Sequence, residues 1–120
     1  MQKALFDLLE SDVKLSPLFS QATGPRAQLP RLEFDFLQTT AEEVEGVFRH
    51  RFQFSVWSDL HNYNPGDQIV RLLHTLFHHA RPQLEEASVI LMQFEKTLVS
   101  KDRATRLTHH EITFAALTQK

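Results

Sequence analysis

Apolar residues recur at helical spacing in the first ten positions of the chain. Leu5, Leu8 and Leu9 follow Met1 at i+4, i+7 and i+8, and charged side chains lie on the other side. This period is typical of a helix with one apolar face. The sequence therefore predicts a short amphipathic helix that frays near Asp12.

A second helical period lies in the middle of the chain. Asn64, Pro65 and Asp67 form a start signal, because asparagine caps a helix, proline fits its first turn and an acid there faces the helix dipole. The apolar positions that follow keep the 3.6-residue period: Ile69, Leu72, Leu73, Leu76, Phe77 and Ala80. We expect Pro82 to end this helix.

Two segments of alternating apolar and polar residues predict a first β-hairpin. The positions that share one face are Leu32, Phe34 and Phe36 in the first segment and Phe48, His50, Phe52, Phe54 and Val56 in the second. The acidic piece between them, TTAEEVEG, has no apolar face and is expected to be a long, protruding loop. Glu33 and Asp35 point away from the apolar face, as do Arg49 and Arg51. Antiparallel pairing would bring these unlike charges together across the ladder.

A second hairpin is predicted after residue 88. The positions that share a face are Ile90, Met92, Phe94 and Leu98 in a third strand, which begins near Ser88, and Ile112, Phe114 and Ala116 in a fourth. The first half of the fourth strand, TRLTHH, is too polar to be buried. The hairpin tip, around Lys101 to Arg106, is expected to project beyond the core.

The predicted element order is α-β-β-α-β-β, which defines an α+β fold. We expect an antiparallel sheet of about four strands with helices packed on one face. The stretch from Ser16 to Arg31 contains three prolines and one glycine and is predicted to be a long connection. Residues 1–120 are expected to form a single domain, because the sequence contains no internal repeat and no interdomain linker.

Composition narrows the possible functions. A chain of 120 residues with 42% apolar residues can bury one modest core, which excludes separate catalytic and regulatory domains. The formal net charge is −2 and no basic face dominates, which argues against free duplex nucleic acid as the main ligand. The chain has no cysteine, so disulfides, thiol nucleophiles and thiolate metal sites are excluded. Charges near Met1 replace the apolar run of a signal peptide, which indicates synthesis in the cytosol.

The seven histidines suggest a metal-site hypothesis. His74 and His78 are one turn apart on the predicted helix, a spacing that can place two imidazoles on one ion. Asp67 and Arg71 share the same polar stripe, opposite the core, and a guanidinium so close opposes a cation. The sequence therefore favours a solvated polar face over a metal site.

Strand parity predicts the face of the sheet on which three other residues with ring side chains lie. His109 and His110 are consecutive in a predicted strand and would point to opposite faces, so they could not chelate together. Trp57 has the opposite parity from Phe52 and Phe54. We expect its ring to pack under the turn before the middle helix, with a subunit interface as the alternative.

No pattern typical of an enzyme is found. Nucleophilic catalysis would need a base and an oxyanion hole, usually at a tight glycine-containing turn between a strand and a helix. The three glycines are isolated, so neither that turn nor a phosphate-binding loop is present. Glu42, Glu43 and Glu45 lie in one loop without apolar neighbours and are interpreted as a solvated or partner-facing run. The chain is therefore predicted not to be an enzyme.

Four runs together resemble a known family. These are LPRLEFDF, RHRFQFSVWSD, QIVRLLHTLFHHARP and RLTHHEITFAAL, which occur in this order. Their order and spacing resemble the tail completion or tail-terminator proteins of long-tailed phages and gene transfer agents, in which a Leu-Pro pair, here Leu29 and Pro30, opens the first strand. The most specific part is FQFSVW, Phe52 to Trp57. The chain departs from the family in lacking a Tyr-Pro pair in QATGPRAQ and in carrying two histidines where a Tyr-Arg pair is common.

The resemblance implies a structural subunit rather than an enzyme, with no cofactor. It implies a homo-hexameric ring at the head-proximal end of a tail tube, which stops tube polymerisation and joins the tail to the head. The implied partners are other copies of the chain, the major tail-tube protein and a head connector or stopper protein, with DNA only passing through the lumen and no membrane. Synthesis in the bacterial cytoplasm would be followed by incorporation into the tail of a virion or gene transfer agent.

Partner or lumen contacts are expected at the two hairpin loops. The candidate residues are Glu42, Glu43, Glu45, Lys101, Asp102, Arg103 and Arg106. Our hypothesis is that the three glutamates face the lumen or the tube partner, because an acidic lining does not hold DNA phosphates. Two alternatives stay open: a small α+β ligand- or metal-binding domain that uses the His74 and His78 helix face, and a hydrolase with an unrecognised site.

Overall fold

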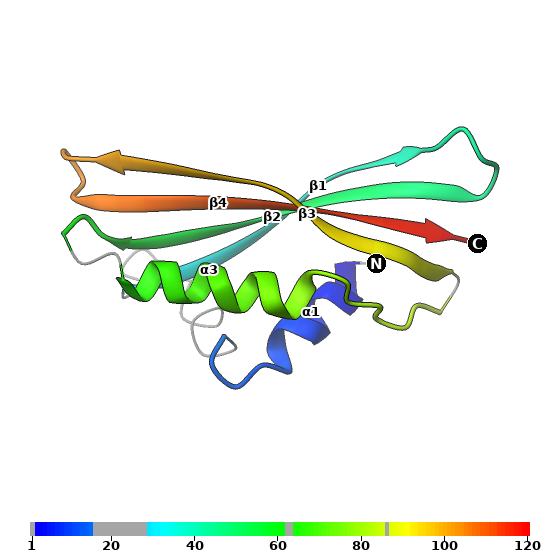
Figure 1. Ribbon diagram of the computed structural model, residues 1–120, viewed down its shortest axis with the longest axis horizontal. Helices are drawn as coiled ribbons and strands as arrows, with labels where there is room; N and C mark the ends of the chain where they lie inside the picture. Colours follow the sequence, from blue (N-terminus) through cyan, green and yellow to red (C-terminus); the bar gives the residue numbers. More distant parts are fainter. Residues whose placement is uncertain (1, 16–28, 62–63, 86) are drawn as a thin grey trace.

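The fold is a four-stranded antiparallel sheet with the two described helices on one face (Figure 1). The computed structural model describes residues 2–15, 29–61, 64–85 and 87–120. The elements are α1 (Gln2–Glu10), β1 (Arg31–Ala41), β2 (Val47–Asp59), α3 (Asn64–Phe77), β3 (Ser88–Asp102) and β4 (Leu107–Gln119). The predicted α+β class, the element order and the one-sided helical layer are confirmed.

The sheet is assembled from two long hairpins placed side by side. Its strand order is β1-β2-β4-β3, so β2 and β4 pair in the centre while β1 and β3 form the two edges. The two hairpin turns lie at opposite ends of the sheet (Figure 1), along a molecule that measures 47 × 26 × 24 Å. Each turn therefore lies far from the other within one chain.

The core lies between the sheet and α3 and is rich in phenylalanine, as the apolar pattern predicted. Phe52, Phe54, Phe77 and Phe114 are fully buried. The rings of Phe52 and Phe114 stack at a centroid distance of 5.6 Å across the central strand pair. Phe77 brings α3 onto this layer, with its ring 4.9 Å from that of Phe54. The aromatic layer thus joins the central strands to the helix.

The N-terminal helix forms where its apolar period predicted it. Leu5 and Leu9 are buried against the sheet. Asp12 then ends the segment in a turn, because its carboxylate accepts hydrogen bonds from the backbone N–H groups of Lys14 and Leu15. Most of the predicted connection that follows lies outside the described residues, which resume at Leu29 with a cis peptide bond to Pro30.

The end of the middle helix was predicted too late. The helix ends at Phe77, not at Pro82. His79 has a positive φ of 65°, and its N–H donates to the carbonyl oxygen of Met92 at 2.8 Å. The chain leaves the helix because this hydrogen bond ties it to the edge strand β3, while Ala80 still packs against the core.

The apolar face of β3 was predicted with the wrong parity at two positions. The register shifts between Val89 and Leu91, so Ile90 is an extra residue and is exposed while Val89 is buried. A second shift follows Phe94, which leaves Leu98 on the outer face, 54% exposed. A bulge inserts one residue and so exchanges the faces beyond it, which simple alternation cannot anticipate.

The prediction that the first half of β4 is too polar to be buried was also wrong. Thr108 and His110 are both buried. The reason is a contact with α3: the ring nitrogen Nε2 of His110 lies 3.0 Å from a carboxylate oxygen of Asp67. Asp67 therefore faces the sheet and does not belong to an outward polar stripe.

The first hairpin differs from its prediction in register and loop length. Glu33 lies opposite Ser55 and Asp35 opposite Gln53, so the expected cross-strand charge pairs do not form. β1 also continues through residue 41, which reduces the expected long loop to residues 42–46. Backbone pairing of β1 with β2 continues past a bulge at residue 37 to Ala41, opposite Phe48, which accounts for the shorter loop.

Gly66 sets how closely α3 can approach the sheet. A Cβ added there would lie 2.7 Å from the hydroxyl oxygen of Ser58 and 3.1 Å from its Cβ. We expect Gly66→Ala to lower the free energy of unfolding by about 1–3 kcal/mol, because the helix must shift. Urea unfolding of the single variant and of Gly66→Ala/Ser58→Ala checks this. The double variant should recover part of the loss, and a single variant as stable as the wild type would contradict the contact.

Candidate assembly surfaces

The seven predicted interface residues do not form one site. The structure divides them into an acidic turn, with Glu42, Glu43 and Glu45, and a basic turn, with Lys101, Asp102, Arg103 and Arg106. The acidic turn joins β1 to β2 and the basic turn joins β3 to β4, at opposite ends of the long axis (Figure 1).

The acidic turn is held by backbone hydrogen bonds. The N–H of Glu42 donates to the carbonyl oxygen of Val47, and the N–H of Val47 donates to that of Val44. Gly46 has a positive φ of 80°, and its carbonyl oxygen accepts from the N–H of Lys120 at 3.0 Å. The turn is thus tied to the end of the central strand β4 and presents its glutamates from a fixed backbone.

The three glutamates differ in their surroundings. A carboxylate oxygen of Glu42 lies 2.7 Å from the Nε of Arg49, so this residue belongs to an ion pair on the sheet. Glu43 and Glu45 make no ion pair within the described part of the chain. Between them, Val44 is 64% exposed. The tip of the turn therefore presents two uncompensated carboxylates and an apolar side chain.

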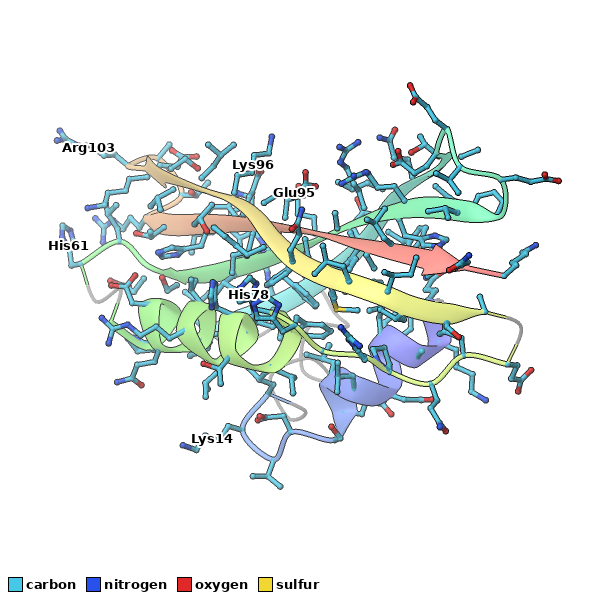
Figure 2. All side chains as sticks on the ribbon, turned by 45° about the vertical axis from the view of Figure 1, so that its right-hand side comes forward. Lys14, His61, His78, Glu95, Lys96 and Arg103 are labelled. Carbon is cyan, nitrogen blue, oxygen red and sulfur yellow. The ribbon has the colours of Figure 1, made fainter. Side chains whose placement is uncertain are left out.

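The basic turn is equally well held. A carboxylate oxygen of Asp102 accepts a hydrogen bond from the N–H of Ala104 at 2.9 Å. The carbonyl oxygen of Arg106, which has a φ of 59°, accepts from the N–H of Leu60 at 3.0 Å. Arg103 lies at the far end of the hairpin (Figure 2), and it makes no ion pair among the residues that the structure describes, nor does Arg106. Because Asp102 serves the turn itself, the tip presents positive charge.

The outer face of the sheet carries further charges in pairs. The Nε of Arg51 on β2 lies 3.0 Å from a carboxylate oxygen of Glu95 on β3, across the central strand β4. Together with the Arg49–Glu42 pair, this ion pair compensates two of the guanidinium groups on this face. Sequence reasoning missed these pairs, because the Arg51–Glu95 pair depends on the strand order and the Arg49–Glu42 pair on the register of the first hairpin.

Trp57 lies on the outer face and not under the turn before the helix, so that prediction was wrong. Its ring stacks on the His109 ring at a centroid distance of 3.8 Å, and the guanidinium carbon of Arg31 lies 5.3 Å from the Trp57 centroid. Burial lowers the pKa of His109. His110 points to the opposite face, toward α3, as strand parity predicted. The stacked Trp57 and His109 rings therefore lie on the outer face, at one end of the sheet.

The helix histidines lie close together, as their spacing predicted. The ring centroids of His74 and His78 are 4.9 Å apart, and the N–H of Phe94 donates to Nδ1 of His78. Partial burial and the neighbouring His79 and His74 rings lower the pKa of His78. No group of three or more potential metal ligands occurs within the described residues. His78 thus contributes to the contact between α3 and β3 (Figure 2).

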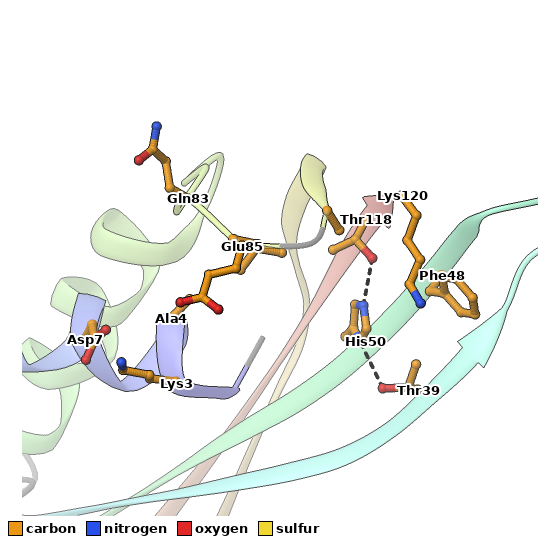
Figure 3. A pocket seen from close by; sticks show the side chains of 12 residues that line it. Lys3, Ala4, Asp7, Thr39, Phe48, His50, Gln83, Glu85, Thr118 and Lys120 are labelled. Atoms are coloured by element: carbon orange, nitrogen blue, oxygen red, sulfur yellow. Dashed lines mark hydrogen bonds between the residues drawn. The ribbon is translucent and has the colours of Figure 1, made fainter.

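A cavity of about 660 Å³ lies beside α1, near the end of the sheet that carries the acidic turn (Figure 3). His50 forms part of its wall, and its two ring nitrogens are each 2.8 Å from a hydroxyl oxygen, of Thr39 on β1 and of Thr118 on β4. Lys3 and Lys120 also line this cavity. His50 therefore links the three strands β1, β2 and β4 at the wall of this cavity.

His50 makes stability depend on pH. Burial lowers its pKa from the ordinary value of 6.5, so the unfolded chain binds a proton at a pH where the folded chain does not. Stability should consequently decrease as the pH falls below about 6.5 toward the folded-state pKa. We expect His50→Gln, whose amide can still bond to both hydroxyls, to reduce the loss of stability between about pH 7.5 and 5.5. Denaturant unfolding at both pH values measures this, and an unchanged pH dependence would contradict it.

The fold and these surfaces define a class of protein: a small α+β subunit whose most prominent features are two projecting, oppositely charged hairpin turns. Within the described residues, no helix is both long and apolar enough to span a membrane. The comparison with known families is specific. The tail completion protein gp17 family matches residues 3–119, nearly the whole chain, and the chain belongs to this family.

The comparison with solved structures agrees in fold. A chain in the structure titled "Virion of native gene transfer agent (GTA) particle" has a TM-score of 0.77 and 15% sequence identity to this protein. The match covers 100% of this chain and 95% of that one. A search of curated protein sequences finds no match. The family is one of structural tail proteins rather than of enzymes, as the sequence resemblance implied.

Proposed function

We propose that this protein forms a homo-hexameric ring at the head-proximal end of a tail tube, where it ends tube polymerisation and joins the tail to the head connector. The observation that carries the proposal is the family match over residues 3–119. The shared fold with a chain of a gene transfer agent virion supports it. Synthesis would take place in the bacterial cytoplasm, before incorporation into the particle.

The shape of the subunit is suited to this role. A ring subunit needs contacts to two neighbouring copies, and a joining protein needs further contacts to a tube protein below and a connector or stopper protein above. The edge strands β1 and β3 leave backbone groups available on both sides of the sheet. The acidic and basic turns project from its two ends. We assign the seven charged residues of these turns to contacts with a partner or the lumen.

Passage of DNA through such a ring is compatible with the charges of the outer face. Free lysine and arginine side chains would bind the phosphates and slow the passage of DNA. The guanidinium groups of Arg49 and Arg51 are instead each paired with a carboxylate. DNA would therefore pass as cargo and not as a tightly bound ligand.

The genetic test is deletion of the gene that encodes this chain from a particle-producing strain. The account predicts heads and tails that stay unjoined, with tubes of irregular length, in electron micrographs. A plasmid copy of the wild-type gene should restore joined particles. Normal joined particles from the deletion strain would contradict the proposed role.

A further inference from the structure

The two hairpin turns are complementary to each other in charge and in apolar exposure. The acidic turn presents Glu43 and Glu45 around the exposed Val44, and the basic turn presents Arg103 and Arg106. Of the seven large exposed apolar side chains among the described residues, five lie on the two hairpins, Leu37 and Val44 on the first and Ile90, Leu98 and Val99 on the second. Each hairpin thus offers an apolar surface beside charges that are unpaired within the described residues.

The two turns of one chain cannot contact each other. They lie at opposite ends of a molecule 47 Å long (Figure 1). Both are held by backbone hydrogen bonds, through Gly46 and Lys120 at one end and through Leu60 and Arg106 at the other. A surface that is already ordered loses little conformational entropy when it binds. The turns are therefore pre-organised to bind a partner of opposite charge.

We propose that this partner is a second copy of the chain: the acidic turn of one copy contacts the basic turn of the next. This interface rests on the proposed ring function and specifies how its subunits join. A two-fold contact between like turns would oppose carboxylate to carboxylate or guanidinium to guanidinium, which costs energy. An antiparallel two-fold pair would join unlike turns but would use both turns of each copy within one dimer, so it could not extend to a ring. A head-to-tail contact joins unlike charges throughout. Contacts of this heterologous kind generate a closed ring when the rotation between successive copies closes, as the proposed ring function requires.

The contact buries apolar groups as well as joining charges. Val44 would leave water against the apolar side chains of the neighbour's second hairpin, where Leu98 and Val99 are each more than half exposed. Burial of such side chains favours binding in proportion to the apolar area that is removed from water. The charges would then select the head-to-tail arrangement while the apolar contact contributes affinity.

The absence of cysteine allows a clean cross-linking test. Val44→Cys labels the acidic turn and Ala104→Cys labels the basic turn without changing any charge. Each single variant, their equimolar mixture and the double variant are oxidised over a range of protein concentrations and, separately, within assembled particles. Products are separated by denaturing electrophoresis without reductant.

The proposed contact predicts a different product from each sample. Each single variant should stay uncross-linked, and the mixture should give only a dimer. The double variant should give a ladder of covalent oligomers. In free protein, salt added before oxidation should lower the yield of this ladder. A dimer from Val44→Cys alone, or a dimer as the largest product of the double variant, would show a two-fold contact and overturn the proposal. A cross-link only to a tube or connector protein in particles, or no cross-link in either setting, would also overturn it.

The same variants separate this interface from the ring function. If joined particles form and contain the chain but the double variant gives no ladder, the subunits join through another surface and the function stands. If the ladder forms but deletion of the gene leaves joined particles intact, the interface stands and the function is wrong.

Discussion

Replacement of Phe52 by alanine is expected to lower the free energy of unfolding by about 3–5 kcal/mol. The Phe52 side chain is fully buried, and its ring contacts those of Phe54, Phe77 and Phe114 at centroid distances of 5.6 to 5.8 Å. Its removal leaves a cavity where both central strands meet α3, and packed aromatic rings cannot collapse into it without moving the helix. A loss of this size approaches the whole stability of a small domain.

A matched control for this variant is Leu98→Ala. Leu98 is also a large apolar residue of the sheet, but its side chain is 54% exposed on an edge strand. Its truncation should change the free energy of unfolding by no more than about 0.5 kcal/mol. Urea titration followed by circular dichroism compares the two variants. Equal effects would contradict the described core.

The variant Glu43→Lys/Glu45→Lys is expected to reduce the yield of joined particles roughly tenfold or more, because a loss of only 1.4 kcal/mol per contact already gives a tenfold change. The two reversals place positive charge where we propose that Arg103 and Arg106 of the neighbour bind. They leave the Glu42–Arg49 ion pair intact, so the hairpin itself should still fold. Electron microscopy counts joined particles, and thermal unfolding of the isolated chain checks its fold.

Two further variants separate charge complementarity from other roles of the acidic turn. Reversal of Arg103 and Arg106 to glutamate in the same chain should restore part of the yield, because the turns are again complementary. Glu10→Lys/Glu85→Lys makes the same change in net charge elsewhere on the surface and should have little effect. Unchanged yield for Glu43→Lys/Glu45→Lys would contradict a partner role of the turn. A failed rescue would place the glutamates against the tube or the lumen.

Hydrophobic periodicity predicted most of the fold, because most of this chain's elements follow one undisturbed period. The alternation from Phe48 to Val56 has no bulge, so the inward face of β2 was predicted at every position. The 3.6-residue period placed Ile69, Leu73 and Phe77 in the core. Element types and their order follow from such local patterns.

The errors arose where a contact between distant segments decides the local structure. Ile90 is exposed because of a bulge whose position depends on pairing with β4. His110 is buried because α3 covers it and Asp67 bonds to it, two elements apart in the chain. Arg51 pairs with Glu95 only because β4 lies between their strands.

The seven candidate interface residues were chosen by charge and by loop position, and their role in an interface stays a prediction. The sequence places both sets at hairpin turns, which is confirmed. It does not show that the two turns lie at opposite ends of the sheet, because that depends on how β2 and β4 pair. The proposed contact between turns of successive copies could therefore be formulated only from the structure.

A cryo-electron microscopy reconstruction of the particle neck from the producing strain would show directly where this chain lies. We expect six copies of the chain in one ring at the head-proximal end of the tail tube. Each acidic turn should lie against the basic turn of the next copy. Location of the chain at the distal tip of the tail, or its absence from the particle, would contradict the account.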